Sequence, residues 1–228
     1  MARQLYELTG ADATRRFSPF CWRARMALAH KGLEAECLPW RFTETDRLAF
    51  AHHDRVPVLV DGDRVVPESW DIAAYLDRAY ADRPALLGTA EPQIRFIASW
   101  TDTIVHPALV RLVVSDIVTL LDPKAAAYFR ASREARLGAT LESVTADREA
   151  KLPAFRALLQ PLRGALRAAP FLGGATPDYA DYAVFGAFQW ARVVSPLELI
   201  EDTDPVHSWR ERLLDRFDGL ARAVPARG

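Results

Sequence analysis

The chain has 228 residues, of which 50% are hydrophobic and 26% charged, a composition typical of a globular protein with ample length for a sizeable core. Its 29 basic and 30 acidic residues nearly cancel, so we expect no general electrostatic attraction to nucleic acid or to a membrane surface. Two cysteines are too few for a disulfide scaffold, and we find no signal peptide and no apolar run that predicts a membrane span, so a cytoplasmic protein is expected.

The first forty residues predict a strand, a helix and a second strand. RQLYEL, residues 3–8, alternates polar and apolar side chains and predicts a strand. Ser18 and Pro19 are residues preferred at a helix start, and Gly32 is preferred just after a helix end. Residues 33–40 predict the second strand. Such a strand–helix–strand unit requires a parallel pair of strands joined by a right-handed crossover.

Residues 55–77, RVPVLVDGDRVVPESWDIAAYLD, predict a β-hairpin followed by a helix. Pro57 opens the first strand, a position that tolerates proline, and Asp61-Gly62 suits a two-residue turn. The helix begins at Ser69, where backbone N–H groups and the helix dipole favour an anion. We interpret this stretch as a small-anion site built from backbone. With a weakly predicted helix over 44–51, the order of elements predicts a thioredoxin-like α/β domain.

The remainder of the chain is predicted to be helical. We expect an α/β domain over residues 1–81, a linker over 82–90 and an all-helical domain over 91–228. Pro107 should kink or break a long first helix. Asp178 and Asp181 form a near relative of a capping box before an apolar helix. The other predicted helices cover residues 125–149 with a bend at Gly138, 151–168 with a division at Pro161, and 205–217.

Together these segments resemble the glutathione transferase family over nearly the whole chain. The most specific part is VPVLVDGDRVVPESWDIAAYLD, which is similar to the strand–turn–strand–helix segment of that family. The resemblance implies a thioredoxin-like domain followed by an all-α domain, glutathione as the bound thiol, and a homodimer. It also implies a cis peptide before Pro57, pairing of the Val56 backbone with the cysteinyl unit, and binding of the γ-glutamyl end by Glu68 and Ser69.

Within the family, three segments resemble the bacterial β-etherase-like members, which use glutathione to cleave aryl ethers. These segments are SPFCWRARMALAHKG, HPALVRL and YFRASREARLG. Helices of the SWRxRxAL type also occur in zeta-class transferases and isomerases, so the subgroup stays open.

Ser18 is the candidate catalytic residue, because its hydroxyl at a helix N-terminus could stabilise the thiolate of glutathione. The alternative is that Ser18 only caps the helix. Cys21 is a second candidate for thiol chemistry, but we expect it to be buried, and Cys37 in the second predicted strand to lie in the core. Arg41 could reach the glycyl carboxylate of glutathione or simply lie on the surface.

The second substrate is expected between the domains. Its candidate pocket residues are Phe17, Trp100, Val105, Tyr128 and Trp190, although aromatic residues at helical spacing also form ordinary cores. His106 has no partners at metal-binding spacing, so we expect no metal site and assign it to the helix kink before Pro107.

Three functions remain open from the sequence. The leading hypothesis is attack of the glutathione thiolate on a small hydrophobic electrophile, aromatic or an aryl ether. The second is isomerisation through a reversible glutathione adduct, in which no glutathione is consumed. The third is a glutathione-binding module without catalysis.

Overall fold

The computed structural model describes residues 3–227. Its N-terminal part is built on a four-stranded sheet with the strand order β2-β1-β3-β4. β1 runs parallel to β2 and antiparallel to β3, and β3 runs antiparallel to β4. The strands are β1 (Gln4–Leu8), β2 (Glu36–Trp40), β3 (Val58–Asp61) and β4 (Arg64–Pro67).

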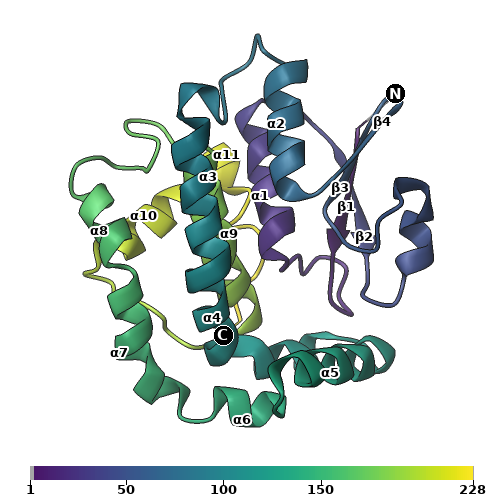
Figure 1. Cartoon of the computed structure of the whole chain (residues 1–228), viewed down its shortest axis with the longest axis vertical. Helices are drawn as coiled ribbons and strands as arrows, with labels where there is room; N and C mark the ends of the chain where they lie inside the picture. Colours follow the sequence, from purple (N-terminus) through teal and green to yellow (C-terminus); the bar gives the residue numbers. More distant parts are fainter. Residues whose placement is uncertain (1–2, 228) are drawn as a thin grey trace.

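Two helices cover the face of the sheet that looks toward the rest of the chain (Figure 1). α1 (Pro19–His30) is the crossover between β1 and β2, and α2 (Ser69–Ala79) follows the hairpin. The 3₁₀ helix η1 (Thr45–Ala51) lies on the other side, where a weak helix was predicted. The predicted thioredoxin-like arrangement is therefore confirmed.

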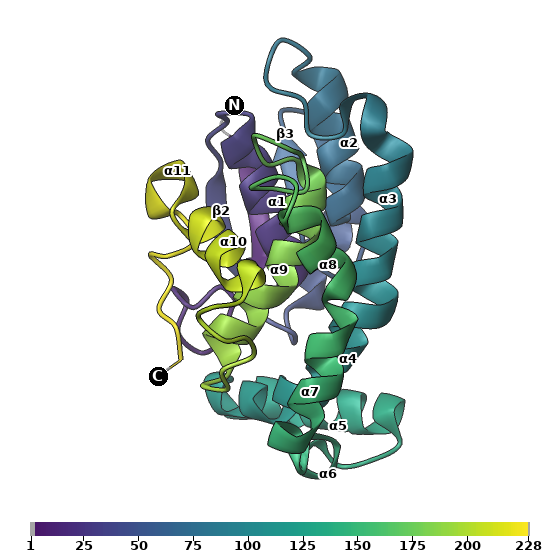
Figure 2. The same cartoon turned by 90° about the vertical axis from the view of Figure 1, so that its left-hand side faces the viewer.

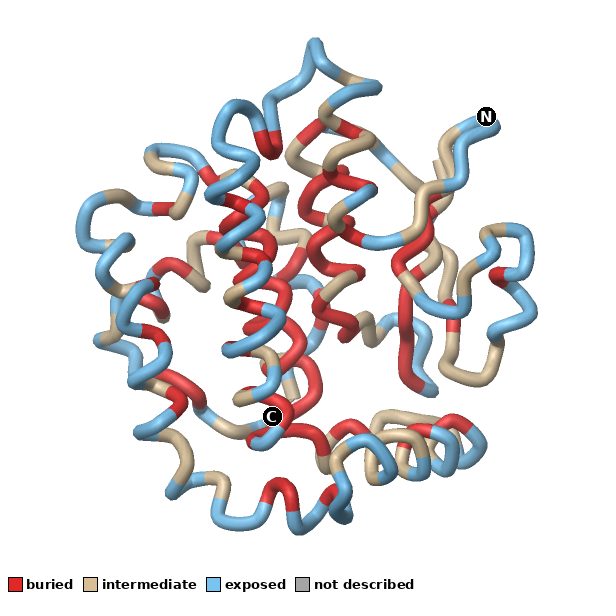
Figure 3. Tube along the Cα trace, in the orientation of Figure 1, coloured by how far each residue is buried: buried red, intermediate tan, exposed pale blue. Residues whose placement is uncertain are grey.

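The C-terminal part is helical, and its core helix is α9 (Tyr179–Val194), of which nearly all residues are buried (Figure 3). α9 packs against α1 and so joins the two parts (Figure 2). The capping box predicted at its start is confirmed, with Asp178 as the N-cap residue and Asp181 at the N3 position. The other helical segments are η2 (Gly88–Ala90), α3 (Glu91–Trp100), η3 (Thr101–Val105), α4 (His106–Val113), η4 (Val114–Leu120), α5 (Pro123–Leu137), α6 (Leu141–Thr145), α7 (Arg148–Leu158), α8 (Gln160–Leu166), α10 (Pro205–Leu214) and α11 (Arg216–Gly219).

The predicted interruption at Pro107 takes the form of a π-helical turn. Residues Thr101–Val105 adopt this turn, and the amide of His106 bonds to the carbonyl of Thr101 five residues earlier. Proline has no amide hydrogen and its ring collides with the preceding turn, so the wider helix accommodates it.

Three predicted helix boundaries were wrong, and one of them is the end of the last predicted helix, which lies at Leu214 and not at residue 217. The helix expected over residues 125–149 ends at Leu137, because Gly138 takes a left-handed conformation with φ 67°. The helix expected from residue 151 begins at Arg148 and is followed by α8, where Pro161 lies in the first turn. Proline is well tolerated there because the first amides of a helix have no intrahelical partner.

One helical stretch is long and apolar enough to cross a membrane by length and composition, Gly88–Leu120 with 33 residues. The expectation that the chain has no such run was therefore wrong in that respect. The stretch consists of α3, α4 and the turns around them, and both helices pack against α9. This contact buries part of the apolar stretch within the fold.

Candidate functional site

The hairpin and the start of α2 are joined through their backbones. The Val56–Pro57 peptide is cis, as the family resemblance implies. The carbonyl of Pro57 accepts a hydrogen bond from the amide of Glu68 at 3.2 Å. Within residues 3–227, the amide and carbonyl of Val56 have no hydrogen-bond partner. Both groups are therefore available to an extended ligand, which could pair with them as an added strand does.

Glu68 has an unusual backbone conformation at the point where α2 begins. Its φ is 65° and its ψ 134°, a sparsely populated region for a residue other than glycine, with a cost of about 1–3 kcal/mol. Its carboxylate is half exposed and lies 3.2 Å from Nε2 of His53. Ser69, the next residue, is buried. The pair places a carboxylate beside the N–H groups of a helix start, an arrangement that can bind an ammonium and a carboxylate of one ligand.

Ser18 is the N-cap residue of α1 and also faces a cavity. Its Oγ accepts a hydrogen bond from the amide of Cys21 at 3.3 Å. This bond uses only a lone pair of the oxygen, so capping does not occupy the hydroxyl hydrogen, which can be donated to another group. Capping and donation are thus compatible in one geometry, without rotation of the hydroxyl between partners.

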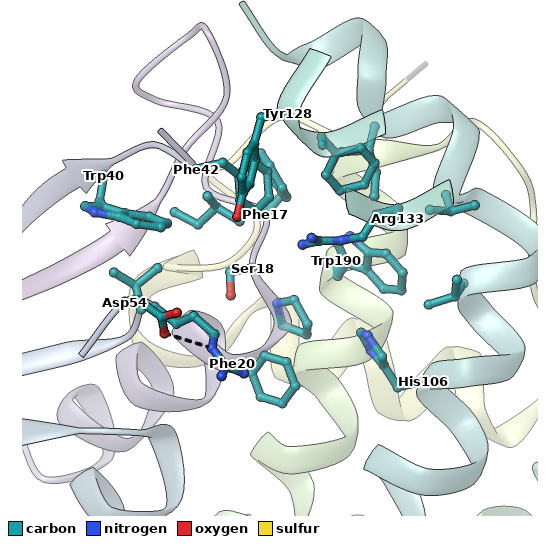
Figure 4. A pocket seen from close by; sticks show the side chains of 18 of the residues that line it. Phe17, Ser18, Phe20, Trp40, Phe42, Asp54, His106, Tyr128, Arg133 and Trp190 are labelled. Carbon is teal, nitrogen blue, oxygen red and sulfur yellow. Dashed lines mark hydrogen bonds and ion pairs between the residues drawn. The ribbon is translucent and has the colours of Figure 1, made fainter. Parts of the chain in front are cut away.

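The cavity has a volume of about 420 Å³ and lies between the sheet and the C-terminal helices (Figure 4). Ser18 and Val56 belong to its lining. Much of the remaining wall is aromatic, formed by Phe17, Phe20, Phe42, Tyr128, Phe129 and Trp190. The size is that of a small-molecule site, and such walls favour a flat apolar ligand.

Three of the five predicted pocket residues lie together in this wall, namely Phe17, Tyr128 and Trp190. Trp100 and Val105 do not belong to the lining, which corrects their assignment. Val105 is completely buried, and Trp100 is partly buried against the core. Trp100 directly precedes the π-helical turn and Val105 ends it, so a regular helical repeat inferred from sequence does not extend from one residue to the other.

Arg41 is also absent from the cavity lining. Its guanidinium lies 4.0 Å from the carboxylate of Glu44 and 3.9 Å from that of Asp122, and the side chain is 40% exposed. Arg41 therefore lies at the surface, as the second of the two interpretations from the sequence expected.

Neither cysteine is placed to react as a thiolate. Cys21 is buried, and burial together with the nearby Glu7 carboxylate raises its pKa to about 12. Cys37 is partly buried rather than fully in the core, and burial raises its pKa to about 11. At neutral pH both thiols stay protonated, so neither cysteine supplies a thiolate.

Most of the residues that line the cavity were not predicted to do so, and two of them, His106 and Arg133, carry polar groups of chemical interest. His106 stacks on Trp190 with ring centroids 4.7 Å apart, and burial lowers its pKa to about 4, so its ring is neutral at pH 7. Arg133 extends from α5 into the cavity (Figure 4). The only sequence features that could have indicated these two residues were the His-Pro dipeptide and a charged helix. A His-Pro dipeptide is more often a helix interruption, and a charged helix face more often faces solvent. Among residues 3–227 no group of three or more His, Cys, Asp or Glu side chains is placed to hold a metal ion.

Two family models match the chain. One is described as the N-terminal domain of glutathione S-transferase and covers residues 17–79, and the other as its C-terminal domain and covers residues 93–218. Glutathione S-transferase U22 of Arabidopsis thaliana is 27% identical over 176 residues, which are 76% of this chain and 69% of that protein. Glutathione S-transferase U12 of the same plant is 27% identical over 193 residues, 81% of this chain and 64% of that protein. The chain thus spans about two thirds of the length of these relatives.

Solved structures show the same fold at lower identity. Glutathione transferase GSTFuA3 from Phanerochaete chrysosporium superposes with a TM-score of 0.83 at 22% identity, covering 93% of this chain and 96% of that one. CsGST63524 of Ceriporiopsis subvermispora, solved in complex with glutathione, superposes with a TM-score of 0.81 at 22% identity, covering 96% and 97% of the two chains.

Proposed function

This chain belongs to the glutathione S-transferase family, and from that premise we propose that it binds glutathione and uses its thiolate to attack a small hydrophobic electrophile. The observation that carries the proposal is the joint position of Ser18 and Val56 in one aromatic cavity. Ser18 offers a hydroxyl hydrogen, and Val56 offers a backbone amide and carbonyl that have no partner within residues 3–227.

Glutathione would lie along the Val56–Pro57 backbone. Its cysteinyl unit would pair with Val56, which leaves its sulfur on the side of Ser18. Its γ-glutamyl end would reach the start of α2, where Glu68 suits the α-ammonium and the buried Ser69 suits the α-carboxylate. The hydrogen bond from the amide of Glu68 to the carbonyl of Pro57 holds the start of α2 next to the Val56–Pro57 backbone.

Ser18 would make the bound sulfur reactive. A free thiol has a pKa of about 8.5, and only the thiolate is a competent nucleophile. One pKa unit corresponds to about 1.4 kcal/mol, which is within the range of one hydrogen bond to a charged sulfur. The start of α1 adds a favourable dipole.

The second substrate is proposed to be aromatic, because the wall beyond Ser18 is formed largely by aromatic side chains. Aryl ethers are included in this class, since the aryloxide leaves as the sulfur–carbon bond forms. The first helix and α5 resemble those of β-etherase-like members, and this resemblance supports aryl ethers as test substrates.

Isomerisation through a reversible adduct is the second candidate, and one observation favours it. Glutathione S-transferase Z1 of Arabidopsis thaliana is 39% identical to this chain over 69 residues, which are 28% of this chain and 31% of that protein. The thiolate chemistry would be the same, but glutathione would be regenerated.

The experiment is retention on a glutathione matrix, followed by turnover of a neutral chloronitrobenzene, a β-aryl ether and a cis-enone diacid. Consumption of glutathione with the first two compounds is the expected result. Turnover of the third without loss of glutathione would favour isomerisation. Saturable binding of glutathione with no turnover of any compound would contradict catalysis and leave a binding module.

A further inference from the structure

We propose that the second-substrate side of the cavity selects aromatic electrophiles that carry an anionic group, such as a ring carboxylate, and that Arg133 binds this group. The inference rests on the proposed function and adds a specificity-determining residue to it. It starts from a guanidinium that lies in a largely aromatic cavity and that forms no ion pair with any carboxylate of residues 3–227.

Arg133 is held by aromatic rings and not by an acid. Its guanidinium carbon lies 4.9 Å from the ring centre of Phe129 and 5.3 Å from that of Phe42. Among residues 3–227 its only hydrogen bond goes from Nη1 to Oγ of Ser132 at 3.0 Å, and it has no ion pair. A guanidinium has five N–H donors, so most of its donors are free. The rings restrict the side chain before any ligand binds, which lowers the entropic cost of binding an anion.

Arg130 on the same helix shows what an arginine paired within the protein looks like. Its guanidinium donates to Glu134 at 2.8 Å and to Glu142 at 2.7 Å, and it lies outside the cavity lining. α5 carries three arginines at three-residue spacing, Arg130, Arg133 and Arg136, of which Arg130 is neutralised by carboxylates. Arg133 and Arg136 line the cavity and, within residues 3–227, have no such partner.

The charged groups around Arg133 also favour an anionic ligand. Arg136 lines the cavity as well and, within the described residues, has no ion pair, whereas Arg55 is paired with Asp54 at 3.1 Å. Burial, and then the neighbouring Arg136, lower the pKa of Arg133. His106 is neutral at pH 7 and adds no charge. An anion between these groups would relieve the repulsion and replace the water lost by Arg133.

The position of Arg133 separates this anion from glutathione. Arg133 reaches the cavity from α5, across from the wall that holds Trp40 and Asp54 (Figure 4). Val56 and Ser18 would take the cysteinyl unit, and the aromatic rings beside Arg133 would take the second substrate. An aromatic carboxylate could pack against the aromatic wall, and its carboxylate could accept hydrogen bonds from the free N–H groups of the guanidinium.

The test compares two electrophiles with the same leaving group, 4-chloro-3-nitrobenzoate and 4-chloro-3-nitrobenzamide, each corrected for its uncatalysed rate with glutathione. The wild-type protein should prefer the benzoate. Arg133→Gln should lower kcat/KM for the benzoate by about tenfold to a hundredfold and that for the benzamide by less than about threefold, as expected for loss of a charged hydrogen bond. Arg130→Gln is the matched control and should retain the preference.

Other results would overturn the proposal. Equal losses on both electrophiles would make Arg133 a structural residue. A weaker affinity for glutathione in Arg133→Gln, with an unchanged benzoate preference, would assign Arg133 to the glycyl carboxylate instead. If neither electrophile reacts, the proposed catalysis fails, and calorimetry with 4-nitrobenzoate in the absence of glutathione still decides: binding weakened in Arg133→Gln supports the anion site, and no binding contradicts it.

Discussion

Ser18 and Cys21 show how residues within one helical turn can differ completely in chemistry. Both lie at the start of α1, and the amide of Cys21 is the group that Ser18 caps. The hydroxyl of Ser18 reaches the cavity, whereas the thiol of Cys21 is buried beside Glu7, with its pKa raised to about 12. Contact with the cavity therefore distinguishes the two side chains, and it favours Ser18 over Cys21 as the proposed partner of a bound thiol.

Replacing Ser18 by alanine should raise the pKa of bound glutathione by about one unit and lower kcat/KM near neutral pH by about tenfold, because the donor to the sulfur is lost. Loss of the cap should also cost about 1 kcal/mol of stability. Thiolate absorbance of the complex as a function of pH measures the first effect. Ser208→Ala, at an exposed serine on α10, is the control. An unchanged thiol titration in Ser18→Ala would leave Ser18 as a cap only.

Replacing Glu68 by glutamine should weaken glutathione binding by about tenfold, because a charged partner of the α-ammonium is lost. Cysteinylglycine lacks the γ-glutamyl group, so its binding should be equal in the two proteins. Calorimetric titration with both ligands measures the difference. If the substitution weakens both ligands alike, Glu68 shapes the backbone and does not contact the γ-glutamyl end.

At the scale of elements, the site depends on how closely α9 approaches the start of α1. Gly186 of α9 lies against the backbone of Pro19, and a side-chain carbon at residue 186 would overlap the carbonyl oxygen of Pro19. Glycine is required here for space rather than for backbone freedom. The close approach places Trp190, one turn later on α9, in the same cavity as Ser18.

Gly186→Ala should therefore destabilise the protein by about 1–3 kcal/mol, as overpacking of a core does. Gly164→Ala in α8 is the matched control, because a side-chain carbon at residue 164 has no neighbour within 4 Å. That substitution should stabilise by about 0.5–1 kcal/mol through helix propensity. Urea unfolding of both variants measures the two effects, and a neutral Gly186→Ala would contradict the tight contact.

At the scale of the molecule, a buried arginine ties the two parts together. Arg23 of α1 donates to Asp102 of the π-helical turn at 2.5 and 3.2 Å, and to the carbonyl of Ala183 in α9 at 3.2 Å. The side chain of Arg23 is 3% exposed and that of Asp102 39% exposed. Removal of Asp102 would leave a buried charge with only one neutral acceptor among these partners.

Asp102→Ala should lower the free energy of unfolding by about 2 kcal/mol, less than for a fully buried pair because water reaches this carboxylate. Glu91→Ala removes the exposed pair with Arg95 and should change stability by no more than about 0.5 kcal/mol. Denaturant unfolding compares the two, and equal effects would show that the inter-element pair contributes nothing beyond a surface ion pair.

The sequence alone determined the elements whose signals are local. Proline, the Asp-Gly turn and the residues at helix starts predicted the hairpin, the first helix and the capping box of α9, because these features depend on backbone geometry within a few residues. The quoted segments were sufficient for the family as well.

Only the tertiary structure decided which side chains share the cavity. Trp100 and Val105 lie beside and at the end of the π-helical turn, outside the cavity wall, and Arg41 lies at the surface near Glu44 and Asp122. In the sequence, Arg133 is one of several charged residues on a polar helix. Its proposed role depends on its contacts with the rings of Phe42 and Phe129 and on the lack of an ion pair within residues 3–227. Such relations between distant segments have no local signature, so they arise only when the chain is folded.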